Sequence, residues 1–398
     1  TPSVNPVVQW NRILLQIVRT PGAQSPTVHP TRSFAILHAA IYDAVNAIDL
    51  THKPYLVRLP GASGSASQDA AAAAAAHQVL VTLYPSFKSQ LDGQLQQSLA
   101  QVPDGTPKTD GVGIGQQVAD RILNLRSNDG SAATPTPFVF GTDPGDYQST
   151  PPNFPKQPQF THWSRVTPFA LQRASQFRPG APPALTTDAY ADALNEVKSL
   201  GIANGTAASA DQALTGRFWN GAIQNYWNEI AQTASLAHHL TTAQNARLFA
   251  LLDLTFADCV IAFYDAKYTY DRWRPVTAVR AAGTDGNDAT TADAAWLPEV
   301  GNTTPDPSYP GAHAVISAAG AAVLTSFFGT DRFDFSVTSE VLPTAEPRSF
   351  TSLSNAAQEA TLSRIFAGVH FRFDLTRGEA LGREIANFVT DRFLKTDR

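Results

Sequence analysis

The chain has 398 residues, of which 43% are hydrophobic and 16% charged, and its formal net charge is −5. This length exceeds a typical single domain, so we expect one large domain or two closely joined ones with a sizeable core. The negative balance excludes a global basic field for binding nucleic acid, so any bound anion must be held by a local cluster.

The arrangement of apolar residues and cysteine restricts the protein class further. The apolar stretches, such as residues 314–324, are shorter than a membrane span. Cys259 is the single cysteine, so no intrachain disulfide is expected. The sequence starts at Thr1 without a charged and apolar leader, which leads us to expect a processed protein that is secreted or periplasmic.

The first region, residues 1–126, is predicted to be helical. Residues 33–48, SFAILHAAIYDAVNAI, carry apolar side chains at helical spacing. Residues 69–84, DAAAAAAAHQVLVTLY, contain seven consecutive alanines, and alanine is the best helix former.

Residues 127–168 differ sharply in composition. The run TPTPFVFGTDPGDYQSTPPNFPKQPQF is rich in proline, glycine and aromatic residues, and such proline density permits neither helix nor strand. Its aromatic side chains favour burial, so we expect a long ordered loop and not a flexible linker. Long loops of this kind often cover functional sites.

Helical patterning resumes in the third region, residues 169–398. Thr187 or Asp188 is suited to begin a helix that Gly201 would end. Further helical segments are expected at residues 227–240, 246–273, 312–329, 354–371 and 377–394. The sequence therefore predicts an all-α protein, with bundles of long helices joined by irregular Pro-rich loops in one compact two-lobed unit.

The first charged cluster lies in AKYTYDRWRPVTAVR. Lys267 and Arg274 are seven positions apart, about two helical turns, so both are expected on one helix face. Pro275 would end or bend the helix and place Arg274 at its terminus. The alternative is a solvated basic edge paired with Asp265 and Asp271.

The second cluster is DPSYPGAHAVISAAGAAV, in which His313 follows three prolines and a glycine. A small-residue helix begins there, and the backbone N–H groups at a helix amino terminus form a ready anion site. The alternative is that His313 has only a structural role.

The third cluster is SRIFAGVHFRFD. His370 and Asp374 are four positions apart and are expected on one helical face, where the carboxylate would orient the imidazole. Arg364 lies about 240° away on an ideal helix, yet both side chains could border one cavity. The alternative is an ion-pair network within a helix interface.

Together these clusters resemble the signature of the vanadium-dependent haloperoxidases, whose basic arrangement the type-2 phosphatidic acid phosphatases share. That signature is Lys, six residues, Arg-Pro; then Pro-Ser-Gly-His; then Ser-Arg, five residues, His, three residues, Asp. Its elements here are Lys267 with Arg274-Pro275, Pro310-Gly311-Ala312-His313, and Ser363-Arg364 with His370 and Asp374. The segments HAAIYDAVNAID, LNEVKSLG and YWNEIA also resemble bacterial haloperoxidases, so the likeness covers most of the chain.

The resemblance implies a haloperoxidase-like fold that binds vanadate, in a site that phosphate can also occupy. His370 would be the axial ligand to the metal. The groups implied to surround the vanadate oxygens are Lys267, Arg274, Arg364 and the backbone of Gly311 and Ala312.

The resemblance also implies an enzyme that uses hydrogen peroxide to oxidise halide to a hypohalous species. His313 would act as the acid–base group, and Lys267 would polarise the bound peroxide. Arg274 and Arg364 would also belong to the catalytic site, where they would neutralise the negative charge of the vanadate oxygens. Iodide and bromide are expected above chloride because they are easier to oxidise. The organic acceptor and the oligomeric state are left open.

The sequence departs from the family pattern before His313, where Gly311-Ala312 replaces Ser-Gly. The lost hydroxyl removes one hydrogen bond to the oxyanion, worth about 0.5–1.5 kcal/mol. Asp306 occupies the position five before Gly311, which helps to shape the halide pocket in the family. Its negative charge would oppose halide approach unless it is paired.

Two other functions are compatible with these residues. One is an acid phosphatase of the same superfamily, in which His370 would be the nucleophile and His313 the proton donor. The other is a non-catalytic oxyanion-binding protein whose altered turn no longer supports turnover.

Overall fold

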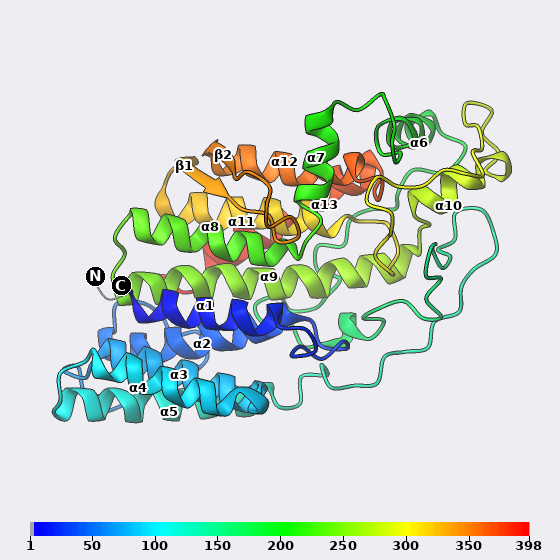
Figure 1. Cartoon of the computed structure of the whole chain (residues 1–398). Helices are drawn as coiled ribbons and strands as arrows, with labels where there is room; N and C mark the ends of the chain where they lie inside the picture. Colours follow the sequence, from blue (N-terminus) through cyan, green and yellow to red (C-terminus); the bar gives the residue numbers. More distant parts are fainter. Residues whose placement is uncertain (1–3, 398) are drawn as a thin grey trace. The chain divides into compact units, whose positions relative to one another are not determined.

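The computed structural model describes residues 4–397. They form two compact units, each built from separate stretches of the chain. The sequence colours of Figure 1 locate these stretches. Unit 1 comprises Thr1–Ala132, Asn228–Ala257 and Asn387–Arg398, and unit 2 comprises Ala133–Trp227 and Asp258–Ala386. This division differs from the three consecutive regions predicted from the sequence, because residues distant in the chain return to pack in unit 1.

Unit 1 consists of helices. Its amino-terminal stretch contains α1 (Pro6–Arg19), α2 (Pro30–Asp49), α3 (Gln68–Leu83), the 3-10 turn η1 (Pro85–Phe87), α4 (Lys88–Ala100) and α5 (Thr106–Arg126). Most of α8 (Ile223–Ala237) and the first part of α9 (Thr242–Tyr270) also belong to it.

The alanine run forms α3, which packs closely against α5. A Cβ atom at Gly115 of α5 would lie 2.4 Å from the carbonyl oxygen of Ala71, and one at Gly111 would lie 2.5 Å from that of Ser67. Only glycine permits this approach, so the helix contact depends on small residues on both helices.

A buried polar pair lies within the core of unit 1. The Nε2 atom of His38 lies 2.8 Å from the Asn11 side-chain oxygen and 3.6 Å from an Asp253 carboxylate oxygen. Burial lowers the pKa of His38 to about 3 and raises that of Asp253 to about 8. Burial therefore favours the neutral form of both groups, and this pair is a structural feature of the core.

Unit 2 holds the predicted chemistry. Its elements are η2 (Trp163–Arg165), α6 (Asp188–Leu200), α7 (Ala210–Phe218), the end of α9, α10 (Pro275–Arg280), η3 (Ala282–Thr284), α11 (Ala312–Phe328), β1 (Arg332–Val337), β2 (Arg348–Ser352), α12 (Leu353–Phe366) and most of α13 (Arg372–Arg392). The Thr187 side chain caps the start of α6 and Gly201 ends it, as predicted. The antiparallel hairpin of β1 and β2 was not predicted.

The Pro-rich segment is an ordered loop of unit 2. Between α5 and η2 the described chain forms no helix or regular strand. The loop is anchored by Tyr147, whose side chain is 1% exposed, and by an isolated bridge between Asp146 and Arg272. Burial of its aromatic side chain explains why this proline-rich stretch remains ordered.

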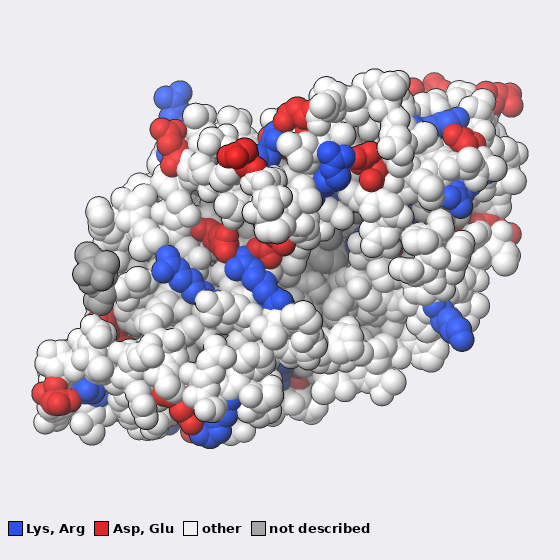
Figure 2. All heavy atoms as spheres, viewed as in Figure 1, with Lys and Arg blue, Asp and Glu red and all other residues white. Residues whose placement is uncertain are grey.

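The structure is mainly helical, as the sequence predicts. No helix within residues 4–397 is both long and apolar enough to cross a membrane. On the face drawn in Figure 2, Lys and Arg side chains are interspersed with Asp and Glu, without an extended patch of one sign.

Candidate active site

The predicted site residues come together within unit 2, although they come from separate segments. Arg274 Nη1 lies 3.0 Å from His370 Nε2, and a Cβ atom at Gly311 would lie 3.6 Å from His370 Nδ1. The charges of Lys267 and Arg364 also act on His370. The three charged clusters therefore form one site.

Lys267 and Arg274 reach this site from different elements. Lys267 lies in the last turn of α9, which ends at Tyr270, and Asp271 follows with a φ of 49°. Arg274 is the N-cap residue of α10, directly before Pro275. The prediction of one continuous helix face for both cations is wrong, and so is the prediction that Pro275 ends the Lys267 helix at Arg274, because Pro275 instead begins α10.

His370 lies in a linker and not on a helix. α12 ends at Phe366 and α13 begins at Arg372. Gly368 turns the chain between them with a φ of 80°, and a Cβ atom there would lie 2.2 Å from the Gly201 carbonyl oxygen. The predicted helical face for His370 and Asp374 is therefore wrong, yet the two side chains meet because Asp374 lies in the first turn of α13.

The hydrogen bonds of His370 define its tautomer. Its Nδ1 lies 2.9 Å from Asp374 Oδ2, which also accepts bonds from the Ser308 hydroxyl and the Phe371 N–H. A carboxylate can only accept, so Nδ1 carries the proton and Nε2 keeps its lone pair. That lone pair accepts a hydrogen bond from Arg274 Nη1.

Asp306 is the unexpected centre of the cationic cluster. Asp306 is only 3% exposed, and its carboxylate pairs with Lys267 Nζ at 3.1 Å and Arg274 Nη2 at 2.7 Å. Burial alone would raise the pKa of Asp306, but the charges of Lys267 and Arg274 outweigh it and lower that pKa. The negative charge of Asp306, which would oppose the approach of a halide if unpaired, is therefore paired with two cations.

The Pro-rich loop reaches the site through Gln159. Its side-chain amide donates to Asp306 Oδ2 at 2.9 Å, and the Tyr264 hydroxyl donates to the same oxygen at 3.3 Å. The Gln159 N–H also donates to the carbonyl oxygen of Pro305 at 2.8 Å. The loop therefore fixes the carboxylate that holds Lys267 and Arg274, a role that no sequence motif indicated.

Arg364 has hydrogen-bonding capacity that the protein leaves unused. Its Nη2 donates to the Asn220 side-chain oxygen at 2.9 Å, but Nε and Nη1 are buried without a partner among residues 4–397. Unsatisfied buried donors are costly. They indicate that a ligand completes this site.

The amino terminus of α11 is the second set of available donors. Gly311 is its N-cap, and no side chain caps the helix. The first N–H groups of a helix, here from Ala312 onward, have no intrahelical partner. The Gly311 N–H itself donates to the Asp374 carbonyl oxygen at 3.0 Å, so it is engaged, contrary to the expectation that it contacts an oxyanion.

His313 lies in the first turn of α11 and keeps partial exposure. Its Nε2 lies 2.8 Å from the Trp219 carbonyl oxygen, so Nε2 carries the proton and Nδ1 is the basic atom. Burial and the charge of Arg364 lower the pKa of His313 well below its ordinary value. A neutral imidazole of this kind can accept a proton.

The electrostatics of the site favour an anion. The three cations Lys267, Arg274 and Arg364 face the two carboxylates of Asp306 and Asp374. At least one positive charge therefore remains uncompensated. Burial lowers the pKa of Lys267 to about 8, and burial together with Arg274 lowers that of Arg364 to about 9. A bound oxyanion would relieve this repulsion and keep both groups charged.

Comparison with known proteins agrees with this geometry. Residues 247–396 match the family model described as the VCPO second helical-bundle domain. The chain is 25% identical to the vanadium chloroperoxidase of Curvularia inaequalis, over 94% of this chain and 79% of that protein. It is 27% identical to the crystal structure of the first bacterial vanadium-dependent iodoperoxidase, with a TM-score of 0.82 and coverage of 99% and 97% of the two chains.

The chain is thus similar to vanadium-dependent haloperoxidases over most of its length, and Lys267, Arg274, Arg364 and His370 lie within the matched domain, residues 247–396. This likeness and the matching fold support a vanadium-dependent haloperoxidase enzyme, as the motif spacing suggested. A bacterial vanadium-dependent chloroperoxidase in its apo form shares the fold with a TM-score of 0.71 at 18% identity, covering 94% of each chain.

The residues of this site fit a tetrahedral oxyanion such as vanadate. The unpartnered Nε and Nη1 of Arg364 supply donors, and His370 Nε2 supplies a lone pair, which Arg274 Nη1 would have to release for it to bind a metal atom. No group of three or more His, Cys, Asp or Glu side chains suited to a metal cation occurs among residues 4–397. Arg364 would hold the oxyanion through its free edge, and His370 would bind the metal atom.

Proposed function

We propose that this enzyme binds vanadate at His370 and uses hydrogen peroxide to oxidise halide, with iodide and bromide favoured over chloride. The observation that carries the proposal is a neutral His370 whose Nε2 lone pair faces a buried cationic cluster containing unsatisfied Arg364 donors. The net reaction is H₂O₂ + X⁻ + H⁺ → HOX + H₂O, in which halide loses two electrons and peroxide gains them.

Vanadate, when bound, supplies a Lewis-acidic centre that activates peroxide. Asp374 holds the His370 ring with Nε2 towards the cluster, and Arg364 donates to the oxyanion. His313 Nδ1 accepts the proton that peroxide loses, because the Trp219 carbonyl fixes the proton of this ring on Nε2. Lys267 and Arg274 provide positive charge that Asp306 orients.

The halide preference follows from Asp306. A carboxylate beside two cations reduces the field that attracts a halide, so little binding energy is available for an anion that holds its water tightly. Iodide and bromide are also easier to oxidise than chloride. Both effects favour the larger halides at this site.

One set of assays tests the proposal. The purified protein is incubated with orthovanadate, peroxide and each halide, and halogenation of a phenolic dye is followed; a phosphate ester is then offered without vanadate. Vanadate-dependent halogenation, fastest with iodide, is expected. Ester hydrolysis without halogenation would identify a phosphatase, and vanadate binding without either reaction would identify a non-catalytic oxyanion-binding protein.

The Gly311→Ser variant tests the missing family hydroxyl. A Cβ atom at residue 311 would lie 3.6 Å from His370 Nδ1 and 3.2 Å from Leu375 Cδ2, so a serine fits after a small shift of Leu375. We expect vanadate affinity to rise by roughly three- to tenfold, since one hydrogen bond is worth about 0.5–1.5 kcal/mol. Gly311→Ala, which adds Cβ without the hydroxyl, is the matched control in the vanadate titration. Equal effects of the two substitutions would contradict the hydroxyl's contribution.

A further inference from the structure

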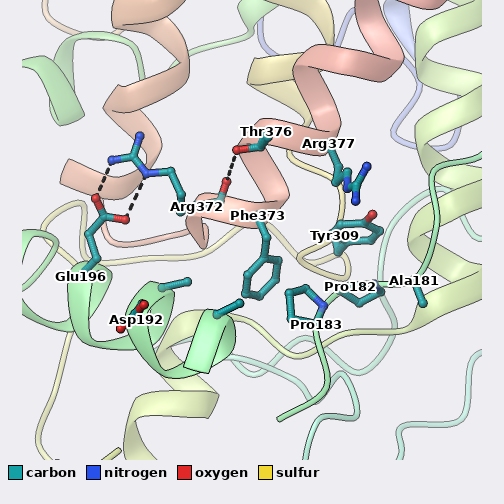
Figure 3. A pocket seen from close by; sticks show the side chains of 12 residues that line it. Ala181, Pro182, Pro183, Asp192, Glu196, Tyr309, Arg372, Phe373, Thr376 and Arg377 are labelled. Carbon is teal, nitrogen blue, oxygen red and sulfur yellow. Dashed lines mark hydrogen bonds and ion pairs between the residues drawn. The ribbon is translucent and has the colours of Figure 1, made fainter. Parts of the chain in front are cut away.

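A cavity lies in unit 2, lined in part by residues next in sequence to those of the oxyanion site. Its volume is about 680 Å³, within the range of roughly 300–1,000 Å³ usual for small-molecule sites. The first turn of α13 and Tyr309 form one side, and residues 181–183 and α6 form the other (Figure 3).

The centre of the cavity is aromatic and rigid. Phe373 lies in the middle of the lining, with Pro183 and Tyr309 on one side of it (Figure 3), and stacks on buried Phe371 with ring centroids 5.0 Å apart. The Tyr309 ring lies 6.4 Å from that of Phe373, and its hydroxyl donates to the Gly180 carbonyl oxygen at 2.5 Å. These contacts fix an apolar surface suited to one flat ring.

Four charged side chains line this cavity, and two of them are already paired. Arg372 and Glu196 form an ion pair at 2.5 Å and neutralise each other. Arg377 and Asp192 are exposed and make no hydrogen bond or ion pair among the described residues. Figure 3 shows Arg377 beside Tyr309 and Asp192 on the other side of Phe373.

The cavity and the oxyanion site share two segments of chain. Tyr309 follows Ser308, whose hydroxyl donates to Asp374, and Phe373 directly precedes Asp374. Asp374 in turn orients His370. A ligand in the cavity is thus held by residues adjacent in sequence to those that form the oxyanion site.

We propose that this cavity binds the organic halogen acceptor, and that the acceptor is a phenol with a carboxylate at the far end of its ring. The carboxylate pairs with Arg377, the ring packs on Phe373, and the phenolic O–H donates to Asp192. A ring between the two polar groups of the ligand suits this cavity, because Arg377 and Asp192 lie on opposite sides of Phe373 (Figure 3).

The proposal rests on the proposed haloperoxidase function for its supply of hypohalous acid. A hydrogen bond to Asp192 increases electron density on the ring carbon next to the phenolic oxygen. That carbon forms a bond to halogen as the O–X bond of HOX breaks, and the ring proton leaves with hydroxide as water: ArH + HOX → ArX + H₂O.

Binding is tested with 4-hydroxyphenylacetate and its neutral isostere 4-hydroxyphenylacetamide, by calorimetry without vanadate or peroxide. We expect the acid to bind the wild-type protein about tenfold more tightly than the amide, because a carboxylate accepts charge-assisted bonds from arginine. In Arg377→Gln this difference should disappear. Arg383→Gln, an exposed arginine of α13 outside the cavity, is the matched control.

Acid and amide binding equally well to the wild-type protein, or no binding of the acid, would overturn the acceptor site. The acceptor site would also be overturned if Arg377→Gln and Arg383→Gln reduced the difference in affinity between acid and amide equally. A separate vanadate titration distinguishes the two proposals: failure of vanadate to bind contradicts the haloperoxidase function, whereas the acid–amide difference depends only on the cavity.

Discussion

Replacing His370 with alanine should abolish tight vanadate binding while phosphate binding is largely retained. His370 Nε2 is the atom proposed to bond to vanadium, whereas the donors of Arg364 and the α11 amino terminus act on any tetrahedral oxyanion. Phosphate in its resting state makes no such bond to nitrogen. The substitution should therefore raise the dissociation constant of vanadate by at least about a hundredfold, equivalent to roughly 2.7 kcal/mol, and that of phosphate by less than about fivefold.

Isothermal titration with each anion measures this selectivity directly. Retained phosphate binding also shows that His370→Ala has folded with its cationic cluster intact. The exposed His238 serves as the control, since His238→Ala should leave both affinities unchanged. Equal losses of affinity for vanadate and phosphate would show that His370 acts only by packing and charge. That result would contradict its role as a ligand to vanadium.

The residues that meet at the site could be predicted from sequence because short motifs carry them. Lys267, Arg274, His313, Arg364 and His370 each lie within a stretch whose local spacing is distinctive. Their convergence follows from the family resemblance, and the structure brings them to one place.

The local backbone at those residues was harder to predict. Apolar periodicity suggested helices through residues 271 and 368, but both positions have positive φ values, 49° at Asp271 and 80° at Gly368. Such a φ depends on tertiary contact, as the close approach of Gly368 to Gly201 shows. Periodicity carries no information about contacts of that kind.

Partners supplied by distant loops were not predicted at all. Gln159 reaches Asp306 across 147 positions, and Asn220 reaches Arg364 across 144. A single glutamine or asparagine in an irregular segment has no motif that marks it. The division into two units is likewise a tertiary property, because residues 228–257 pack with the amino-terminal helices.

Replacing Asp306 with asparagine should strengthen oxyanion binding and lower the stability of the folded protein when no anion is bound. The substitution keeps the shape of the side chain but removes the negative charge that pairs with Lys267 and Arg274. Breaking a buried ion pair by removing one partner costs about 3–5 kcal/mol. The same unpaired cations then interact with a bound oxyanion without competition, so we expect phosphate and vanadate to bind at least about tenfold more tightly.

Thermal unfolding with and without each anion separates these two effects. In Asp306→Asn the melting temperature should fall by several degrees without anion, and added phosphate or vanadate should recover more stability than in the wild type, because tighter binding to the folded state stabilises it further. The apparent KM for iodide should also fall, since the halide meets one negative charge fewer.

Asp258→Asn provides the matched control for lost stability. Asp258 is a buried carboxylate of unit 2 that accepts bonds from the N–H groups of residues 169–171. Its substitution should lower the melting temperature and leave anion affinity unchanged. If Asp306→Asn bound phosphate more weakly than the wild type, the carboxylate would be needed to position Lys267 and Arg274, and its charge would not limit anion binding. Tighter binding would instead show that the family's cationic site is here partly neutralised from within.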